Sequence, residues 1–186
     1  MTGNATRSIG VLVMALLPTS CVGEIEGPPA MHEWMAGIER PSRADFEPVA
    51  NALQASCGTL DCHGQSGRAL RLFGGRGLRL SAADDSGGGV TTTAEYDAAY
   101  WSVVGLEPEL LSAVVRDRGA LPERLTMIAK ARGIEKHKGG TLIKPRDSLD
   151  SCLTSWLAGK TEETACTAAR PVPPPVAGRH REEEAP

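Results

Sequence analysis

The stretch Cys57-Gly58-Thr59-Leu60-Asp61-Cys62-His63 decides how this chain of 186 residues is interpreted. Two cysteines followed directly by a histidine are the arrangement that attaches a c-type haem. Each thiol can form a thioether with one porphyrin vinyl group, and the imidazole can bind the iron. Four residues separate the cysteines, which is a longer spacer than the usual pattern has. The spacer can loop outward at Gly58, so the sequence predicts covalent haem at Cys57 and Cys62 with His63 as an iron ligand.

The same cysteines have two other interpretations. Cys57 and Cys62 can form a small disulfide with each other, which would leave His63 as an exposed neighbour. They can also contribute to a site for zinc or another metal. Zinc is disfavoured, because no second Cys/His pair stands at ligand spacing in the sequence.

All five cysteines should have a role if the protein is exported, because free thiols seldom persist in an oxidising compartment. Cys21 can carry lipid, and Cys57 and Cys62 can carry haem. Cys152 and Cys166 then remain. We expect a disulfide between them that joins the last predicted helix to the segment after it and contributes about 2–3 kcal/mol of stability.

Residues 1–20 are predicted to be an export signal. Arg7 precedes an apolar run over residues 9–17 that is too short to span a bilayer. The small residues before Cys21 resemble a bacterial lipobox, although Pro18 stands where leucine is usual. We therefore expect a protein of the cell envelope whose Cys21 is tethered by lipid to the inner or outer membrane, with plain secretion as the alternative.

Composition divides the remainder into a linker, one domain and a tail. Residues 21–42 are predicted to be the lipidated N-terminus and a linker rich in proline and glycine. Residues 170–186, rich in proline and charge, are expected to be disordered. The segment 43–169 is long enough for one compact domain. A net charge of −3 gives no support for a nucleic-acid partner.

Apolar residues recur at helical spacing, so the domain is expected to be mainly α-helical. The first helix is predicted to start at a Ser42 cap, to bury Phe46, Val49 and Leu53, and to lead straight into Cys57.

Three further helices follow in the prediction. One starts at residues 91–93, one covers 107–115 and one covers 148–158, where Gly159 stands at the position of a C-terminal cap. No convincing alternation of apolar and polar residues indicates strands.

Residues 64–90 are glycine-rich and are expected to form an ordered loop around a ligand. Arginines recur in this segment beside leucines. A guanidinium group suits a carboxylate, and haem propionates are carboxylates, so Arg68 and Arg71 are candidate propionate ligands. A solvated basic face is the other interpretation of these arginines.

The order of these features resembles the cytochrome c fold, in which an apolar helix leads into Cys…Cys-His and a last helix follows a variable middle. More narrowly, the chain is similar to exported cytochrome-c-like domains of myxobacteria and planctomycetes. The similar stretches are CGTLDCHG, AEYDAAYWSVVGLEPELLS, HKGG and DSCLTSWLAG. The resemblance implies haem c and electron transfer with exported redox partner proteins. The middle stretch RALRLFGGRGLRL does not belong to the general cytochrome c pattern.

A six-coordinate iron would need a second ligand from farther along the chain. His137 is the first candidate, because the related domains carry a similar His-Gly-Gly stretch and flanking glycines let the backbone approach a macrocycle closely. Met127 is the alternative, although it can equally be a core methionine. An open or water-filled position is the third possibility. His32 and His180 lie toward the chain ends and are interpreted as incidental.

We therefore expect a monohaem electron carrier of the cell envelope. An enzyme is less favoured, because peroxide chemistry needs a distal base and a polarising arginine, and the sequence does not identify both. The chain also has no phosphate-binding loop and no Gly-x-Ser-x-Gly nucleophile motif. The alternative from another class is a haem-free surface lipoprotein that is stapled by disulfides and has a binding or structural role.

Overall fold

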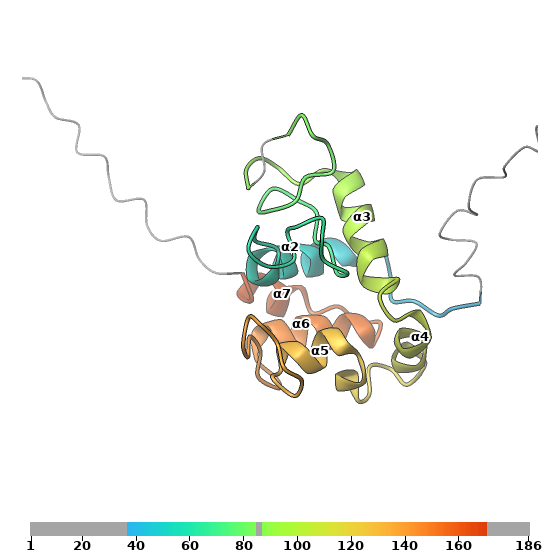
Figure 1. Ribbon diagram of the computed structural model, residues 1–186. Coiled ribbons are helices and arrows are strands. Elements are labelled where there is room, and N and C mark those ends of the chain that lie inside the picture. The colour runs from blue at the N-terminus through green and yellow to red at the C-terminus, as the bar shows by residue number, and fades with distance from the viewer. Residues whose placement is uncertain (1–36, 85–86, 171–186) are drawn as a thin grey trace, which may run out of the picture. The chain divides into compact units, whose positions relative to one another are not determined.

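The computed structural model of the chain describes residues 37–84 and 87–170. The predicted signal at 1–20, the lipidated Cys21 and the predicted tail beyond Arg170 lie outside these residues, as do His32 and His180. Within the described residues, regular structure consists of six α-helices and one short 3-10 helix, with no β-strand (Figure 1). The prediction of a mainly α-helical domain is confirmed.

The helices follow one another along the chain with loops of very different length. In order they are α2 (Phe46–Cys57), α3 (Thr93–Val104), α4 (Pro108–Arg116), the 3-10 helix η1 (Pro122–Arg124), α5 (Thr126–Ala131), α6 (Ser148–Leu157) and α7 (Glu163–Ala168). The longest loop joins α2 to α3 and contains the glycine-rich segment, in which Phe73 and Leu78 form an isolated bridge. None of these helices is long and apolar enough to cross a membrane.

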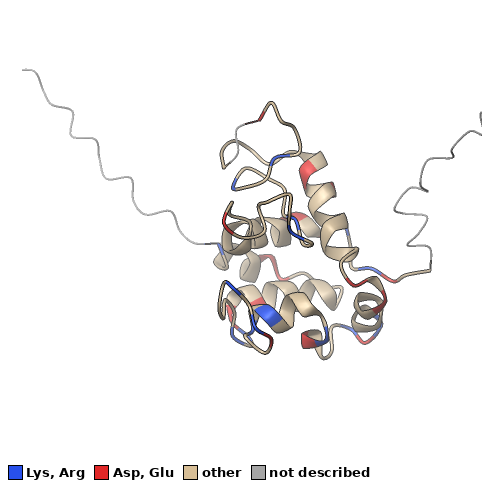
Figure 2. Ribbon diagram, viewed as in Figure 1, with Lys and Arg blue, Asp and Glu red and all other residues tan. Residues whose placement is uncertain are grey.

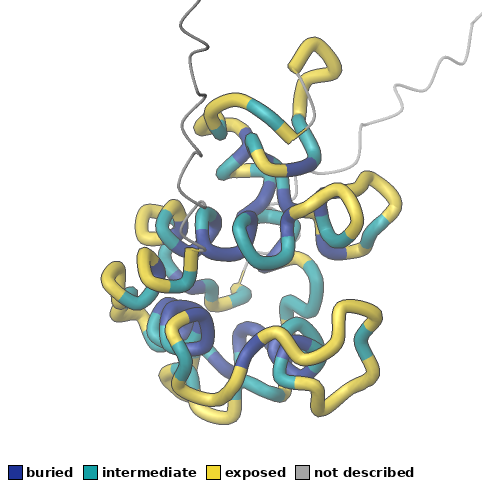
Figure 3. The backbone as a smooth tube through the Cα atoms, turned by 90° about the vertical axis from the view of Figure 1, so that its left-hand side faces the viewer, coloured by how far each residue is buried: buried dark blue, intermediate teal, exposed yellow. Residues whose placement is uncertain are grey.

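Aromatic side chains from three helices form the centre of the hydrophobic core. Phe46 of α2 has its ring centroid 5.0 Å from that of Trp156 in α6 and 5.4 Å from that of Tyr100 in α3. All three side chains are buried, and aromatic pairs at such separations add to the stabilisation that burial provides. The buried stretches in Figure 3 lie mainly on helices, whereas the loops are largely exposed. The core therefore joins the first described helix to one near the end of the chain.

Residues 37–42, the described end of the predicted linker, pack on these helices. The indole N–H of Trp156 donates to the carbonyl oxygen of Ser42 at 2.8 Å, and the Tyr100 hydroxyl donates to that of Pro41 at 3.0 Å. Pro41 is buried. The polar groups of the aromatic core are therefore satisfied by this segment of backbone.

Helix α2 begins at Phe46, later than the sequence predicted. The Ser42 hydroxyl does not cap the helix; it accepts the N–H of Asp45 at 3.2 Å in the turn that precedes it. Pro48 lies in the first turn, where an α-helix has no intrahelical partner for the N–H that proline lacks. The helix then runs to Cys57, as predicted.

Helix α3 begins at the predicted threonines. The hydroxyl of Thr92 accepts the Glu95 N–H at 3.3 Å, and the Glu95 carboxylate accepts the Thr92 N–H at 2.8 Å, which together form a capping box. The same carboxylate binds Arg79, with 2.7 Å between Nε and Oε1 and side-chain exposures of only 6% for Arg79 and 1% for Glu95. This buried ion pair attaches the glycine-rich segment to the start of α3.

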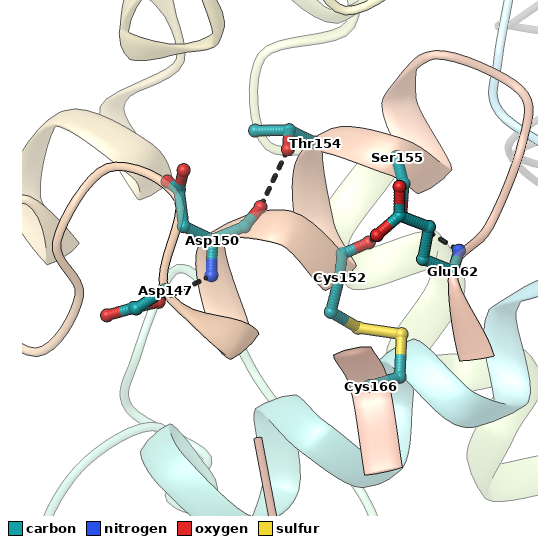
Figure 4. The surroundings of a disulfide bond; sticks show 7 residues. All are labelled: Asp147, Asp150, Cys152, Thr154, Ser155, Glu162 and Cys166. Carbon is teal, nitrogen blue, oxygen red and sulfur yellow. Dashed lines mark hydrogen bonds between the residues drawn. A yellow bond between two sulfur atoms is a disulfide. The ribbon is translucent and has the colours of Figure 1, made fainter. Parts of the chain in front are cut away.

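The predicted disulfide between Cys152 and Cys166 is present and connects α6 to α7 (Figure 4). Both cysteines are buried, and α6 and α7 pack against each other and against α2. Asp147 caps α6 by accepting the N–H of Asp150 at 2.9 Å. Helix α7 itself was not predicted, and neither were η1 and α5, which are each six residues long or shorter.

Candidate functional site

The segment that follows α2 folds back on itself and closes the spacer between the two cysteines. The N–H of His63 donates to the carbonyl oxygen of Cys57 at 2.9 Å, and the N–H of Cys62 donates to that of Thr59 at 2.9 Å. The four spacer residues therefore form a closed turn at the end of α2. This turn returns the chain to Cys57, so the longer spacer does not separate His63 from the helix end.

Cys57 and Cys62 are free thiols in the structure, so the small disulfide that was considered for them is not formed. Burial raises the pKa of Cys57 to about 11, and the neighbouring Cys62 contributes in the same direction. Cys57 is therefore a protonated thiol at neutral pH. A thiol with so high a pKa reacts slowly with oxidants and alkylating reagents, because the thiolate is the reactive form.

His63 is held by a single backbone carbonyl. Its Nδ1 lies 3.1 Å from the carbonyl oxygen of Leu70, which can only accept, so Nδ1 carries the proton and Nε2 has a free lone pair. Burial lowers the pKa of His63. The Leu70 carbonyl opposes this change, and the positive charges of His137, Arg68 and Lys130 reinforce it. The ring is therefore neutral at pH 7, the form in which histidine binds a metal.

His137 lies in the loop between α5 and α6 and is held in the same manner. Its Nδ1 lies 3.1 Å from the carbonyl oxygen of Gly140, which again leaves Nε2 available. The ring is partly buried, although the residues on either side of it are exposed. Backbone carbonyls thus select the same free nitrogen in both histidines, the arrangement commonly found at metal-binding imidazoles.

The two histidine rings come together although the residues lie far apart in the sequence. Their centroids are 6.1 Å apart and their planes differ by 18°. A metal–imidazole bond is about 2 Å long and its nitrogen lies about 1 Å from the ring centre, so two rings that bind one metal from opposite sides have centroids about 6 Å apart. The observed separation is therefore compatible with both histidines binding one metal.

The set of protein donors fits the iron of a haem better than it fits a bare metal ion. A structural zinc site needs four protein ligands. In the described part of the chain, no group of three or more His, Cys, Asp or Glu residues is placed to hold a metal ion. Haem iron receives its equatorial ligands from the macrocycle and needs only axial ligands from the protein. His63 and His137 can supply those two ligands, with Cys57 and Cys62 beside them for attachment.

The glycine-rich segment packs directly on the turn that carries Cys57 and Cys62. A Cβ atom added to Gly64 or to Gly77 would collide with the carbonyl oxygen of Gly58. The N–H of Leu72 also donates to the carbonyl oxygen of His63 at 2.9 Å. This segment was predicted to surround a ligand, and in the structure its glycines allow close contact between backbones at the cysteine turn.

The two arginines predicted to bind propionates differ in their surroundings. Arg68 is at the site, where its Nε donates to the carbonyl oxygen of Cys62 at 3.1 Å and a longer contact of 3.5 Å joins Nη2 to that of Asp61. Arg71 is exposed, and its backbone N–H donates to the Ser102 hydroxyl at 2.7 Å. Arg68 therefore contacts the cysteine turn, which the sequence did not predict.

Met127, the alternative iron ligand, lies in α5 and packs against the hydrophobic core. Among the described residues, the ring that lies near His63 is that of His137. The carbonyl groups of Leu70 and Gly140, which orient the two imidazoles, were missed by sequence reasoning. A backbone carbonyl has no signature in the sequence, so only the folded chain reveals that role.

Models of protein families, curated proteins and solved structures were compared with this chain, and no match was found among them. We therefore infer the function from the residues of the site and from their geometry.

Proposed function

We propose that this chain is a monohaem c-type cytochrome with a cytochrome-c-like helical domain, and that it transfers electrons in the cell envelope. In this proposal Cys57 and Cys62 would attach the haem through thioethers, and His63 and His137 would hold its iron. The observation that carries the proposal is the approach of the two imidazole rings to 6.1 Å, each with Nδ1 held by a backbone carbonyl.

The chain's own residues have distinct parts in this function. His63 presents a neutral imidazole, the Gly140 carbonyl orients the ring of His137, and Arg68 holds the turn that contains Cys62. The bound haem supplies one-electron redox chemistry, and ligation by two histidines generally gives a lower reduction potential than ligation by histidine and methionine. If His63 and His137 both held the iron, the protein would leave no coordination position open for a substrate, which favours an electron carrier over an enzyme.

The loop between α5 and α6 provides a basic surface beside His137. Lys136 and Lys138 flank the histidine and are exposed, and Lys144 is exposed farther along the same loop (Figure 2). The whole chain has a net charge of −3, so this concentration of cations is local. Complementary charge steers the encounter of two proteins, and we propose that exported redox partners approach this loop.

Export and anchoring complete the proposal. Haem attachment through thioethers and a buried Cys152–Cys166 disulfide both suit an exported protein. The predicted signal at residues 1–20 and the predicted lipid on Cys21 would retain the domain at the inner or outer membrane.

The test is a pyridine haemochrome spectrum of the protein expressed with its signal and a cytochrome c maturation system. We expect an α band at the position of haem with two thioether bonds, which survives extraction with acidified acetone. The double variant Cys62→Ser/His63→Ala should lack this absorbance. A folded wild-type protein without covalent haem under these conditions would contradict the proposal.

A second candidate is a haem-free surface lipoprotein with a binding or structural role. It is favoured by the disulfide between α6 and α7, which lies within a hydrophobic core built from side chains of the described helices. The same double variant separates the two candidates. A haem-free lipoprotein would have no colour before the substitution or after it, and would lose only some stability.

A further inference from the structure

A pocket of about 660 Å³ lies apart from the two histidines, and none of Cys57, Cys62, His63 and His137 lines it. Three parts of the chain form its wall: α2, the glycine-rich segment and the end of α7. The polar side chains in the wall are Asn51, Gln54, Arg76, Thr91, Thr167 and Arg170. This volume is in the range of small-molecule sites in proteins.

The two amide side chains in the wall present hydrogen-bond donors. The Oδ1 of Asn51 accepts the Tyr96 hydroxyl at 3.0 Å, and the Oε1 of Gln54 accepts the Thr91 hydroxyl at 3.0 Å. Their carbonyl oxygens are thus engaged, and the NH₂ groups are the remaining polar atoms. Because Asn51 and Gln54 are three residues apart on α2, they share one face of the helix.

The amide of Gln54 has a donor that lacks an acceptor in this wall. Gln54 is only 3% exposed, and its Nε2 has no hydrogen-bond partner among the described residues. A buried donor without a partner is costly, by about 1–3 kcal/mol. The Thr91 hydroxyl could accept from Nε2 if the amide were rotated, but Oε1 would then lack a partner, so rotation would exchange one unsatisfied atom for another.

The charged side chains that the described residues contribute to the wall are both positive. Arg76 and Arg170 are exposed, and neither forms an ion pair with a described residue; among the described residues, no carboxylate lines the pocket. A smaller neighbouring pocket of about 300 Å³ shares Arg170 but is also lined by Glu47 and Glu163. The larger pocket therefore has positive charge and hydrogen-bond donors without the carboxylates that line the smaller one.

We propose that this pocket binds a small organic anion through a phosphate or carboxylate group. Guanidinium groups recognise both kinds of oxyanion, and amide NH₂ groups can donate to the same oxygens. The volume leaves room for more than one inorganic ion. This site is independent of the haem proposal, because it shares no residue with the candidate haem ligands.

Isothermal titration calorimetry of the full chain tests the proposal, with inorganic phosphate and citrate as separate probes at low ionic strength. We expect saturable binding of at least one probe, and the stronger probe identifies phosphate or carboxylate as the preferred group. In the variant Arg76→Gln/Arg170→Gln, the Kd should rise at least tenfold. The variant Asn51→Asp, which puts a carboxylate into the wall with little change in shape, should bind as weakly.

A matched control is the variant Arg118→Gln/Arg146→Gln, which removes the same charge from exposed positions that do not line the pocket. It should bind the probes with the wild-type Kd. Circular dichroism should show all variants folded, because the substituted arginines are exposed. The proposal is overturned if neither probe binds saturably, if Arg76→Gln/Arg170→Gln binds like the wild type, or if the control weakens binding equally.

Discussion

The two loops that carry His63 and His137 hold equivalent imidazoles in very different surroundings. The loop of His63 is fixed by backbone hydrogen bonds to Cys57 and Leu72, by Arg68, and by the glycine-rich segment that covers it. The loop of His137 is exposed at every residue from 133 to 142 except the histidine itself, which is partly buried. Its anchors include a hydrogen bond from the Leu142 N–H to the Ala131 carbonyl oxygen at 2.8 Å.

This difference indicates which ligand depends on the fold and which can be changed without harm to it. A residue held by many buried contacts is expensive to move, whereas an exposed loop opens locally at little cost. The structure therefore provides a firmly placed imidazole at His63 and a more easily displaced one at His137. Substitutions at the two histidines and in the segments that support them test this contrast.

Replacing each histidine in turn should have opposite consequences for haem. The variant His63→Ala should lose covalent haem, because it destroys the Cys-His pair at which attachment occurs. The variant His137→Ala should retain covalent haem, since it leaves the cysteine turn intact, but one axial position should open. Haemochrome absorbance measures the haem content of each variant, and binding of carbon monoxide to the reduced protein measures the open position.

A control for the second ligand is Met127→Leu, which preserves the volume of a core side chain. It should retain haem and should not bind carbon monoxide. Our assignment of His137 is wrong if Met127→Leu opens the iron to carbon monoxide and His137→Ala does not.

The ion pair between Arg79 and Glu95 should be the strongest single support of the segment that covers His63. Breaking a buried pair by removing one partner costs about 3 kcal/mol, so Glu95→Gln should lower the free energy of unfolding by about that amount at pH 7. In the same helix, Asp97 forms an exposed ion pair with Arg43. Asp97→Asn should therefore change stability by less than about 1 kcal/mol. Urea unfolding of both variants measures the difference.

The stabilisation by Glu95 should also depend on pH. Burial alone raises the pKa of Glu95, but the hydrogen bond from Arg79, together with those from the Thr92 and Leu80 N–H groups, lowers it overall. A carboxylate with a lowered pKa stabilises the fold fully above the pKa of a free glutamate, about 4.3, and less as pH falls further. The stability gap between wild type and Glu95→Gln should shrink in acid, and a gap that widens there would contradict this account.

The fold was largely predictable where local signals are strong. The apolar spacing of α2, the threonines before α3 and the glycine after α6 all indicated their helices, and the Cys152–Cys166 disulfide followed from accounting for every cysteine. The short helices η1, α5 and α7 were missed. Segments of six residues or fewer contain too little periodic pattern to be recognised, and their helical form depends on tertiary packing.

The side chains of the candidate site could be selected from the sequence, but the backbone contacts that hold them could not. Cys57, Cys62, His63 and His137 were selected from the sequence, and the structure brings the two histidines together. The contact between Arg68 Nε and a backbone carbonyl of the cysteine turn was not predicted, and the binding of a propionate by Arg68 stays a prediction. Such contacts form only when the chain folds back on itself, and no sequence pattern indicates them.

The reactivity of the Cys57 thiol offers a smaller but direct measure of how closed the turn is. Its pKa of about 11 leaves about a hundredfold less thiolate at pH 8 than an ordinary thiol with the reference value of 9.0. In protein without haem, Cys57 should therefore react with iodoacetamide about tenfold more slowly than glutathione, because the greater nucleophilicity of the more basic thiolate offsets part of the difference. Tandem mass spectrometry of peptides after timed alkylation of the wild-type protein, with fragment ions that separate Cys57 from Cys62, measures this rate.

Equal rates for Cys57 and glutathione would mean that the turn is open in solution before haem is attached. A control in denaturant should bring the rate of Cys57 to that of an ordinary thiol, because unfolding removes the burial that raises its pKa.

The smallest predicted effect comes from one methyl group at the position after His63. The methyl group that Gly64→Ala adds would meet the carbonyl oxygens of Gly58 and Thr59, which are backbone atoms and cannot move aside cheaply. We expect a loss of about 2 kcal/mol in the free energy of unfolding of the protein without haem. Gly67→Ala is the matched control, because a Cβ there meets nothing within 4 Å. Urea unfolding of the two variants compares packing directly, since both add one methyl group to the same segment and both lower the entropy of the unfolded chain. If Gly64→Ala is as stable as Gly67→Ala, then the turn around His63 is not tightly packed and the contrast between the two histidine loops does not hold.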